Sequence, residues 1–215
     1  MSTDADKKAL FDAMVAYKVD GIKAAVTAAS ANGMKATEII DALAEGMTEV
    51  GVKFEKGKLF LPHVLSAAAG MNAAMDMLDE ELRAGGDAAA TSKGKAVMGT
   101  VEGDVHDIGK SICSTMLQCN GFELVDLGRD VPKQKFIDEV KGGCNFCGMS
   151  ALMTTTMTVM KEIIDIMSAE GIRDKCTVMV GGAPITQAYA DKIGADIYGE
   201  SASETTRKAK AVASD

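Results

Sequence analysis

The hydrophobic periodicity of this chain changes once, near residue 85, and this change constrains the fold more than any other feature. Before it, apolar residues recur at helical spacing and predict four helices, at about residues 4–17, 20–31, 37–54 and 62–83. Thr37 is the expected N-cap of the third helix, and Pro62 falls in the first turn of the fourth. Because the connections are short, we expect an antiparallel four-helix bundle.

Residues 85–94 are small and polar, as in a linker, and strands alternate with helices after them. The predicted strands cover residues 96–101, 123–127, 146–152, 177–180 and 196–198. The predicted helices cover residues 108–119, 133–140, 155–169, 185–193 and 203–212. Strands joined by helices form right-handed parallel crossovers, so we expect an α/β doubly wound domain (flavodoxin-like, Rossmann-type) with five parallel strands. The expected organisation is a helical-bundle domain at 1–84, a linker at 85–94 and an α/β domain at 95–215.

Charge and hydropathy exclude several classes of partner. The net charge of −8 argues against nucleic acid, because phosphate binding needs clustered Lys and Arg. No apolar run approaches the roughly 20 residues that span a bilayer. The N-terminus is acidic and polar, unlike a signal peptide, so a cytoplasmic protein without membrane association is expected.

The five cysteines are an odd number and lie among apolar residues, which favours reduced, buried thiols over disulfides. Cys144 and Cys147 match a Cys-x-x-Cys pattern. If both belonged to a strand, their side chains would point to opposite faces, and no second pair completes a zinc site. We interpret both as small core residues.

The residues Asp104-Val105-His106-Asp107-Ile108-Gly109 form a loop at the carboxyl end of the first predicted strand, where open α/β sheets bind ligands. An Asp two residues before a His can orient one ring nitrogen and free the other for a metal. The following Gly109-Lys110-Ser111 resembles the end of a phosphate-binding loop. Five residues separate it from Gly103 where that motif requires four, so this interpretation is rejected.

The helix after this loop is expected to bury Ile108, Ile112, Met116 and Cys119, which follow helical spacing. Lys110 and Arg129 are interpreted as surface charges.

Two further signals fall at the ends of predicted strands: Ser150-Ala151-Leu152 and Gly181-Gly182. Together with Asp104-x-His106-x-x-Gly109, they resemble in order and spacing the cobalamin-binding domains of the methionine synthase type. The helical part, including Gly57-Lys58-Leu59-Phe60-Leu61-Pro62, resembles that family's cap module. Overall the chain is most similar to the free-standing corrinoid proteins of methanogens and acetogens.

The resemblance implies roles for individual residues. His106 would be the lower axial ligand of cobalt in a base-off/His-on cobalamin, one per chain. Asp104 would accept a hydrogen bond from the other ring nitrogen of His106. Thr156 would supply the hydroxyl at the end of this hydrogen-bonded relay, at the position where methionine synthase has Ser. Phe60 would cover the methyl side of the ring. The cofactor's nucleotide tail would run along the remaining site residues, Gly109, Ser150, Leu152, Thr154, Gly181 and Gly182.

By the same resemblance, the protein would carry a methyl group on cobalt, cycling between Co(I) and methyl-Co(III), and would not turn over alone. Its partners would be a substrate-specific methyltransferase, a second methyltransferase to coenzyme M or tetrahydrofolate, and a reductive activator. The alternatives are a cobalamin-binding sensor or storage module and the small subunit of a mutase. The methylated substrate stays open, because in such systems the partner enzyme sets specificity.

Overall fold

A computed structural model describes residues 4–84 and 92–213, which divide into two compact units, Met1–Ser92 and Lys93–Asp215. Most of the predicted linker, residues 85–94, lies outside the described residues. No described helix combines the length and apolar character needed to cross a membrane.

The first unit is built from four helices: α1 (Asp4–Val15), α2 (Val19–Ala31), α3 (Ala36–Glu55) and α4 (Leu61–Ala84). Helix α1 packs on α2 and α3, and α4 packs on the same two helices, so the four enclose one apolar core. Two glycines allow close crossings: a Cβ at Gly46 would lie 2.7 Å from the Met14 side chain, and one at Gly70 would meet Ile22. The predicted bundle is therefore confirmed, including Pro62 in the first turn of α4.

The predicted N-cap of α3 is wrong. The helix begins at Ala36, so Thr37 lies inside its first turn. The preceding Lys35 takes the N-cap position, and its N–H donates to Glu38 Oε2 at 3.2 Å. A first-turn carboxylate thus accepts from the backbone N–H of the N-cap residue, as the acidic half of a capping box does.

The second unit is a parallel sheet of five strands in the order β2-β1-β3-β4-β5. The strands are β1 (Lys95–Thr100), β2 (Glu123–Asp126), β3 (Phe146–Ser150), β4 (Thr177–Gly181) and β5 (Ile197–Gly199). The helices are α5 (Ile108–Cys119), α6 (Lys133–Lys141), α7 (Thr158–Ala169), α8 (Gln187–Ile193) and α9 (Ala202–Ala213), with a 3-10 turn η1 at Arg173–Lys175. This strand order is the flavodoxin-like one, so the predicted fold class is confirmed.

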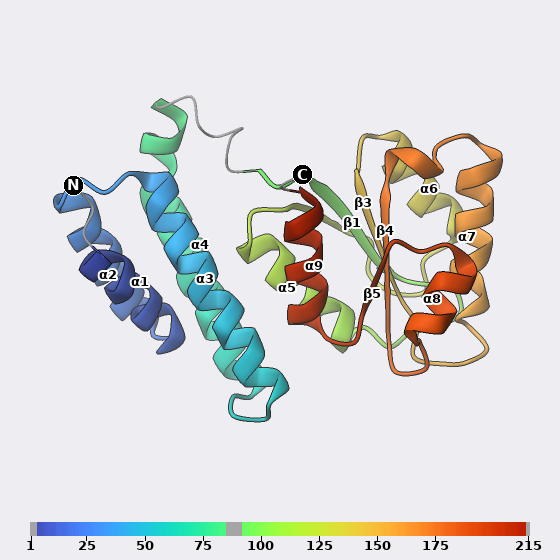
Figure 1. The fold of residues 1–215 in the computed structure, drawn as a ribbon, viewed down its shortest axis with the longest axis horizontal. Helices are drawn as coiled ribbons and strands as arrows, with labels where there is room; N and C mark the ends of the chain where they lie inside the picture. Colours follow the sequence, from blue (N-terminus) through green and yellow to red (C-terminus); the bar gives the residue numbers. More distant parts are fainter. Residues whose placement is uncertain (1–3, 85–91, 214–215) are drawn as a thin grey trace. The chain divides into compact units, whose positions relative to one another are not determined.

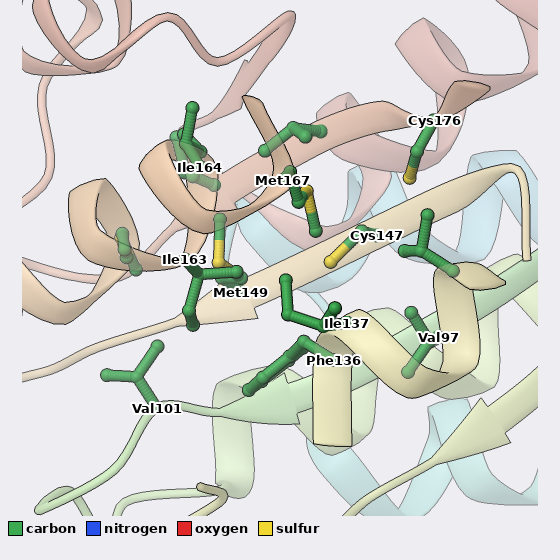
Figure 2. Packing of buried hydrophobic residues seen from close by; sticks show 14 of the residues in the cluster. Val97, Val101, Phe136, Ile137, Cys147, Met149, Ile163, Ile164, Met167 and Cys176 are labelled. Atoms are coloured by element: carbon green, nitrogen blue, oxygen red, sulfur yellow. The ribbon is translucent and has the colours of Figure 1, made fainter. Parts of the chain in front are cut away.

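Alternating residues of each strand feed two cores on opposite faces of the sheet. Val97 and Cys147 face the core beneath α6, α7 and α8, whereas Ala96 and Phe146 face the core beneath α5 and α9. The two helix layers stand on either side of the sheet in Figure 1. Figure 2 shows the first core, in which Phe136 and Ile137 of α6 and Ile163 and Met167 of α7 pack over β1 and β3. A sheet buried on both faces explains why its strands are nearly continuous apolar runs.

Some predicted boundaries and faces are wrong. Strand β3 ends at Ser150 instead of residue 152, and α7 begins at Thr158 instead of residue 155. The intervening residues form a turn that belongs to the site described below. Cys144 precedes β3 instead of lying in it, and packs in the same core as Cys147, so the two thiols do not face opposite sides. All five cysteines are free and buried, as predicted.

Candidate functional site

The carboxylate of Asp104 is the centre of a hydrogen-bond network at the carboxyl edge of the sheet. Its side chain is fully buried in the loop between β1 and α5. Oδ1 accepts from the backbone N–H of His106 at 3.1 Å and lies 2.7 Å from Nδ1 of the same residue. Oδ2 accepts from the N–H groups of Leu152 at 2.8 Å and Met153 at 3.2 Å, and from the Thr156 hydroxyl at 2.8 Å. The turn after β3 thus wraps around a carboxylate that comes from the turn after β1.

These donors keep Asp104 ionised. Burial alone raises the pKa of a carboxyl group, but the hydrogen bonds from Leu152, His106 and Thr156 outweigh burial and hold the pKa of Asp104 well below its usual value. An ionised carboxylate only accepts hydrogen bonds, so the proton between Asp104 and His106 sits on Nδ1.

The geometry leaves the other ring nitrogen of His106 available to a metal. With Nδ1 protonated, Nε2 carries the free lone pair, and the His106 side chain is 48% exposed. Among the described residues, no three His, Cys, Asp or Glu side chains gather in a way that could hold a metal ion. One oriented imidazole without companions suits a metal that arrives with its other ligands already in place.

Large apolar side chains of the same loops are exposed beside this histidine. Val105 is 56% exposed, Ile108 69% and Leu152 45%. The expectation that Ile108 is buried is wrong, whereas Met116 and Cys119 of the same predicted face are buried. The other buried residues of α5 are Lys110, Cys113, Ser114 and Leu117. Exposed apolar groups around a polar centre are typical of a surface that a large ligand covers.

Glycines line the same edge of the sheet. Gly181 pairs with Ser150 of β3 and with Gly199 of β5. A Cβ at Gly182 would clash with the carbonyl oxygen of Ala151, and the φ of this residue is +127°, so the position accepts only glycine. At Gly109 an added Cβ would meet nothing within 4 Å, so the start of α5 borders open space.

The structure brings together most of the predicted site residues. Hydrogen bonds connect Asp104, His106, Leu152 and Thr156, and the strand register places Ser150 beside Gly181. Thr154 is exposed in the turn between Leu152 and Thr156. Phe60 belongs to the helical unit, where it is 66% exposed.

Thr100 and Lys110 were not assigned to this part of the fold from the sequence. Thr100 is fully buried, and its hydroxyl donates to the carbonyl of His106 at 3.1 Å. Lys110 is no surface charge: its side chain is 3% exposed and donates to both oxygens of Asp126, at 2.6 and 2.7 Å. Its position on the inward face of α5, with Cys113 and Leu117, is the signal that could have identified it. Arg129 is exposed, as expected.

Comparison with known proteins identifies the family. The B12 binding domain family matches residues 94–207, and a second B12 binding domain model matches residues 7–79. The chain belongs to the B12-binding proteins.

Its relatives include a whole-length match. This B12-binding protein is 54% identical over 204 residues to dimethylamine corrinoid protein 2 of Methanosarcina mazei, covering 94% of each chain. Its fold matches a solved cobalamin-binding protein from Desulfitobacterium hafniense with a TM-score of 0.82 and 34% identity, over 95% of this chain and 97% of that one. It also matches the methanol:cobalamin methyltransferase complex MtaBC of Methanosarcina barkeri, with a TM-score of 0.77 and 32% identity, over 99% of this chain and 81% of the matched chain.

The residues of this B12-binding protein fit a corrinoid. The ring of a corrinoid supplies its metal's equatorial ligands, so the protein need offer only an axial one, which His106 can provide. The exposed Val105, Ile108 and Leu152 are apolar side chains that the ring could cover. The glycine positions leave the backbone bare where a long side group of the cofactor could pass.

Proposed function

We propose that this corrinoid protein is the methyl carrier of a multi-component, cytoplasmic methyltransferase system. The observation that carries the proposal is the His106–Asp104–Thr156 chain, with distances of 2.7 and 2.8 Å. The bound corrinoid supplies the cobalt that accepts and releases the methyl group. We propose that it binds base-off, with His106 Nε2 as the lower axial ligand, and reaches its methylcobalamin form during the reaction.

Asp104 and Thr156 control the proton and the orientation of His106. Asp104 holds Nδ1–H and so keeps the lone pair on Nε2. The buried carboxylate lies 2.7 Å from Nδ1 and makes Nε2 a stronger electron-pair donor toward a metal. Thr156, which is 7% exposed, neutralises part of the charge on Oδ2 by donating its hydroxyl hydrogen. The basicity of His106 toward a metal therefore depends on two residues that do not touch the metal.

We assign the rest of the site to holding the cofactor. Gly109, Ser150, Leu152 and Thr154, with the Gly181-Gly182 pair, would line the nucleotide tail. Phe60 would cover the methyl face of the ring from the helical unit. The backbone N–H of Phe60 donates to His63 Nδ1 at 2.9 Å, and this bond fixes the backbone at the start of α4.

We propose a methylated amine as methyl donor, and dimethylamine as the first to test. A relative named as a dimethylamine corrinoid protein shares 54% of its residues with this chain along almost its whole length. A substrate-specific methyltransferase would load the carrier, and a second methyltransferase would pass the methyl group to coenzyme M or tetrahydrofolate. A reductive activator would restore the carrier after oxidation.

The decisive experiment is the absorption spectrum of the protein reconstituted with hydroxocobalamin, for wild type, H106A and H63A. His63 is the only other histidine and serves as the matched control. We expect wild type and H63A to share one spectrum and H106A to differ. Identical spectra for H106A and wild type would overturn the axial assignment.

Methyl transfer tests the carrier role. The reduced, loaded protein is incubated with a dimethylamine methyltransferase and dimethylamine, with trimethylamine, monomethylamine and methanol systems in parallel. We expect methylation of the cofactor with dimethylamine. If only another system methylates the cofactor, the proposal of dimethylamine as methyl donor is wrong. If no system methylates it, the proposed carrier role is wrong.

A further inference from the structure

Asp130 connects the loop after β2 to the loop that holds Asp104. Its Oδ1 accepts a hydrogen bond from the N–H of Gly103 at 2.7 Å. Its own N–H donates to the carbonyl oxygen of Asp104 at 2.9 Å. A single residue therefore binds two consecutive residues of the other loop, on both sides of the peptide unit that leads into Asp104.

The backbone of Asp130 has an unusual conformation. Its φ is +51°, and Tyr17 is the other non-glycine residue with positive φ in the described part of the chain. Asp and Asn tolerate the left-handed region better than other side chains do. This conformation allows the N–H and the carboxylate of Asp130 to reach the same neighbouring loop.

The loop that carries Asp130 is itself anchored elsewhere. Asp126 at its start accepts both short bonds from buried Lys110 of α5, and also the N–H of Gly128 at 2.8 Å. The carbonyl oxygen of Gly128 accepts from the N–H of Thr100 at 3.0 Å. None of these bonds is made to a residue between β1 and α5, so the start of the Asp130 loop is held from outside the Asp104 loop.

We propose that Asp130 is a positioning residue for the Asp104–His106 pair. By holding Gly103 and Asp104, it keeps the Asp104 carboxylate within reach of the donors on His106, Leu152, Met153 and Thr156. The use of this pair to bind a corrinoid rests on the proposed function, but the positioning is a property of the cofactor-free protein and can be measured there.

The test is amide hydrogen exchange in the cofactor-free protein, comparing D130G with wild type. Glycine keeps the left-handed backbone and removes only the carboxylate. The Gly103 amide loses its acceptor directly, so its faster exchange is expected in any case. The informative amides are those of Leu152 and Met153, which bond to Asp104 and not to Asp130. We expect both to exchange roughly fivefold to tenfold faster, the effect of weakening one hydrogen-bonded contact.

Two variants are matched controls. D130N keeps an acceptor oxygen and the tolerance for positive φ, so it should exchange like wild type at Leu152 and Met153. R129A alters the exposed neighbour in the same loop and should also leave both amides unchanged. The Val178 amide, in β4, serves as the internal reference for global unfolding.

Unchanged exchange of Leu152 and Met153 in D130G, with faster exchange at Gly103, would overturn the proposal, because Asp130 would then be only a local contact. An equal rise at Val178 would overturn it too, since the effect would be a general loss of stability. If D130G does not fold, D130E answers the same question, because its carboxylate is displaced by one methylene group. The H106A spectrum tests the cofactor ligand independently, so either proposal can fail alone.

Discussion

The amino edge of the parallel sheet, where its strands begin, and the carboxyl edge, where they end, both carry hydrogen-bonded polar side chains. They differ in whether a polar group stays exposed once those bonds are made. At the amino edge, Arg173 donates to the carbonyl oxygens of Cys176 at 2.9 Å and Gly194 at 2.6 Å, and to Asp196 at 2.8 Å. These bonds complete the backbone where strands begin. At the carboxyl edge, Asp104 collects its donors just as completely, yet the network ends on a half-exposed imidazole.

Complete hydrogen bonding alone does not mark the site. Both edges satisfy their buried groups, as stable proteins must. Only at the carboxyl edge does a buried carboxylate, that of Asp104, fix the tautomer of a half-exposed side chain, that of His106. Changes at the amino edge should therefore alter stability alone, whereas changes at the carboxyl edge should alter stability and cofactor binding together.

The largest effect is expected for D104N. The amide has the shape of the carboxylate but cannot accept from all of His106, Leu152, Met153 and Thr156. We expect a loss of about 3 kcal/mol in the free energy of unfolding, because buried donors are left without acceptors. Urea unfolding of the cofactor-free protein at pH 7 measures the loss, and the cobalamin spectrum should change as in H106A. D107N is the neighbouring control, with less than about 1 kcal/mol expected.

The pH dependence of the D104N effect has a defined sign. Hydrogen bonds hold the pKa of Asp104 below its usual value in the folded protein, so its contribution is complete above the unfolded value of about 4. It is lost as the pH falls through the folded value. The stability difference between wild type and D104N should therefore shrink between pH 5 and pH 3 in urea titrations. A difference that stays constant would contradict the assignment of the ionised state.

At the amino edge, R173M is the counterpart. Methionine keeps an apolar stem but cannot donate to Cys176, Gly194 or Asp196. We expect a loss of about 2 kcal/mol in the free energy of unfolding, since three acceptors lose a donor. The spectrum of the bound cobalamin should stay that of wild type. A changed spectrum at unchanged stability would show that the two edges are not separate in function.

The fold was largely predictable, because the change from helical to alternating periodicity is a local signal. The bounds of α5 agree with the prediction at both ends, since Asp107 and Asn120 flank an unbroken helical pattern. The inward face of that helix was predictable only in part: Met116 and Cys119 are buried as expected. Lys110 is buried by Asp126, which lies on another element, and Ile108 is exposed at the site.

The site was predictable only in part. The pattern of Asp104 and His106 indicates an oriented imidazole on chemical grounds alone. Thr156 came from the family resemblance: periodicity placed it in a helix, whereas it lies in the turn before α7. Asp130 had no signal, because neither its positive φ nor its bonds to Gly103 and Asp104 follow from residue type.

A smaller effect is expected for T156V, which removes the hydroxyl and leaves the carboxylate in place. Valine has nearly the same volume but cannot donate to Asp104 Oδ2. Asp104 keeps its bonds from His106, Leu152 and Met153, so we expect a loss of about 1 kcal/mol in the free energy of unfolding. T156S should restore it, because the hydroxyl remains. If T156V destabilises as much as D104N, the hydroxyl and not the carboxylate is the centre of the network.

The smallest effect concerns the thiols, where we expect almost no reaction in the native protein. Burial raises the pKa of Cys144 to about 11 and those of Cys113 and Cys119 to about 12, so little thiolate forms at pH 8. A chromogenic disulfide reagent should react quickly with all five cysteines in urea and with none in the folded protein. S30C, on the exposed surface of α2, is the positive control and should add one fast thiol.

A fast native thiol would change the comparison between the two edges. Cys144, Cys147 and Cys176 pack in one core near the amino edge, and Cys147 and Cys176 are seen there in Figure 2. A reagent reaches them only if that edge opens. One of these thiols could react before urea unfolds the sheet, and R173M could speed that reaction. This result would show that the amino edge opens locally and that the hydrogen bonds of Arg173 limit the opening. If only Cys113 or Cys119 reacts, the opening lies at α5 and not in the core beneath α6, α7 and α8.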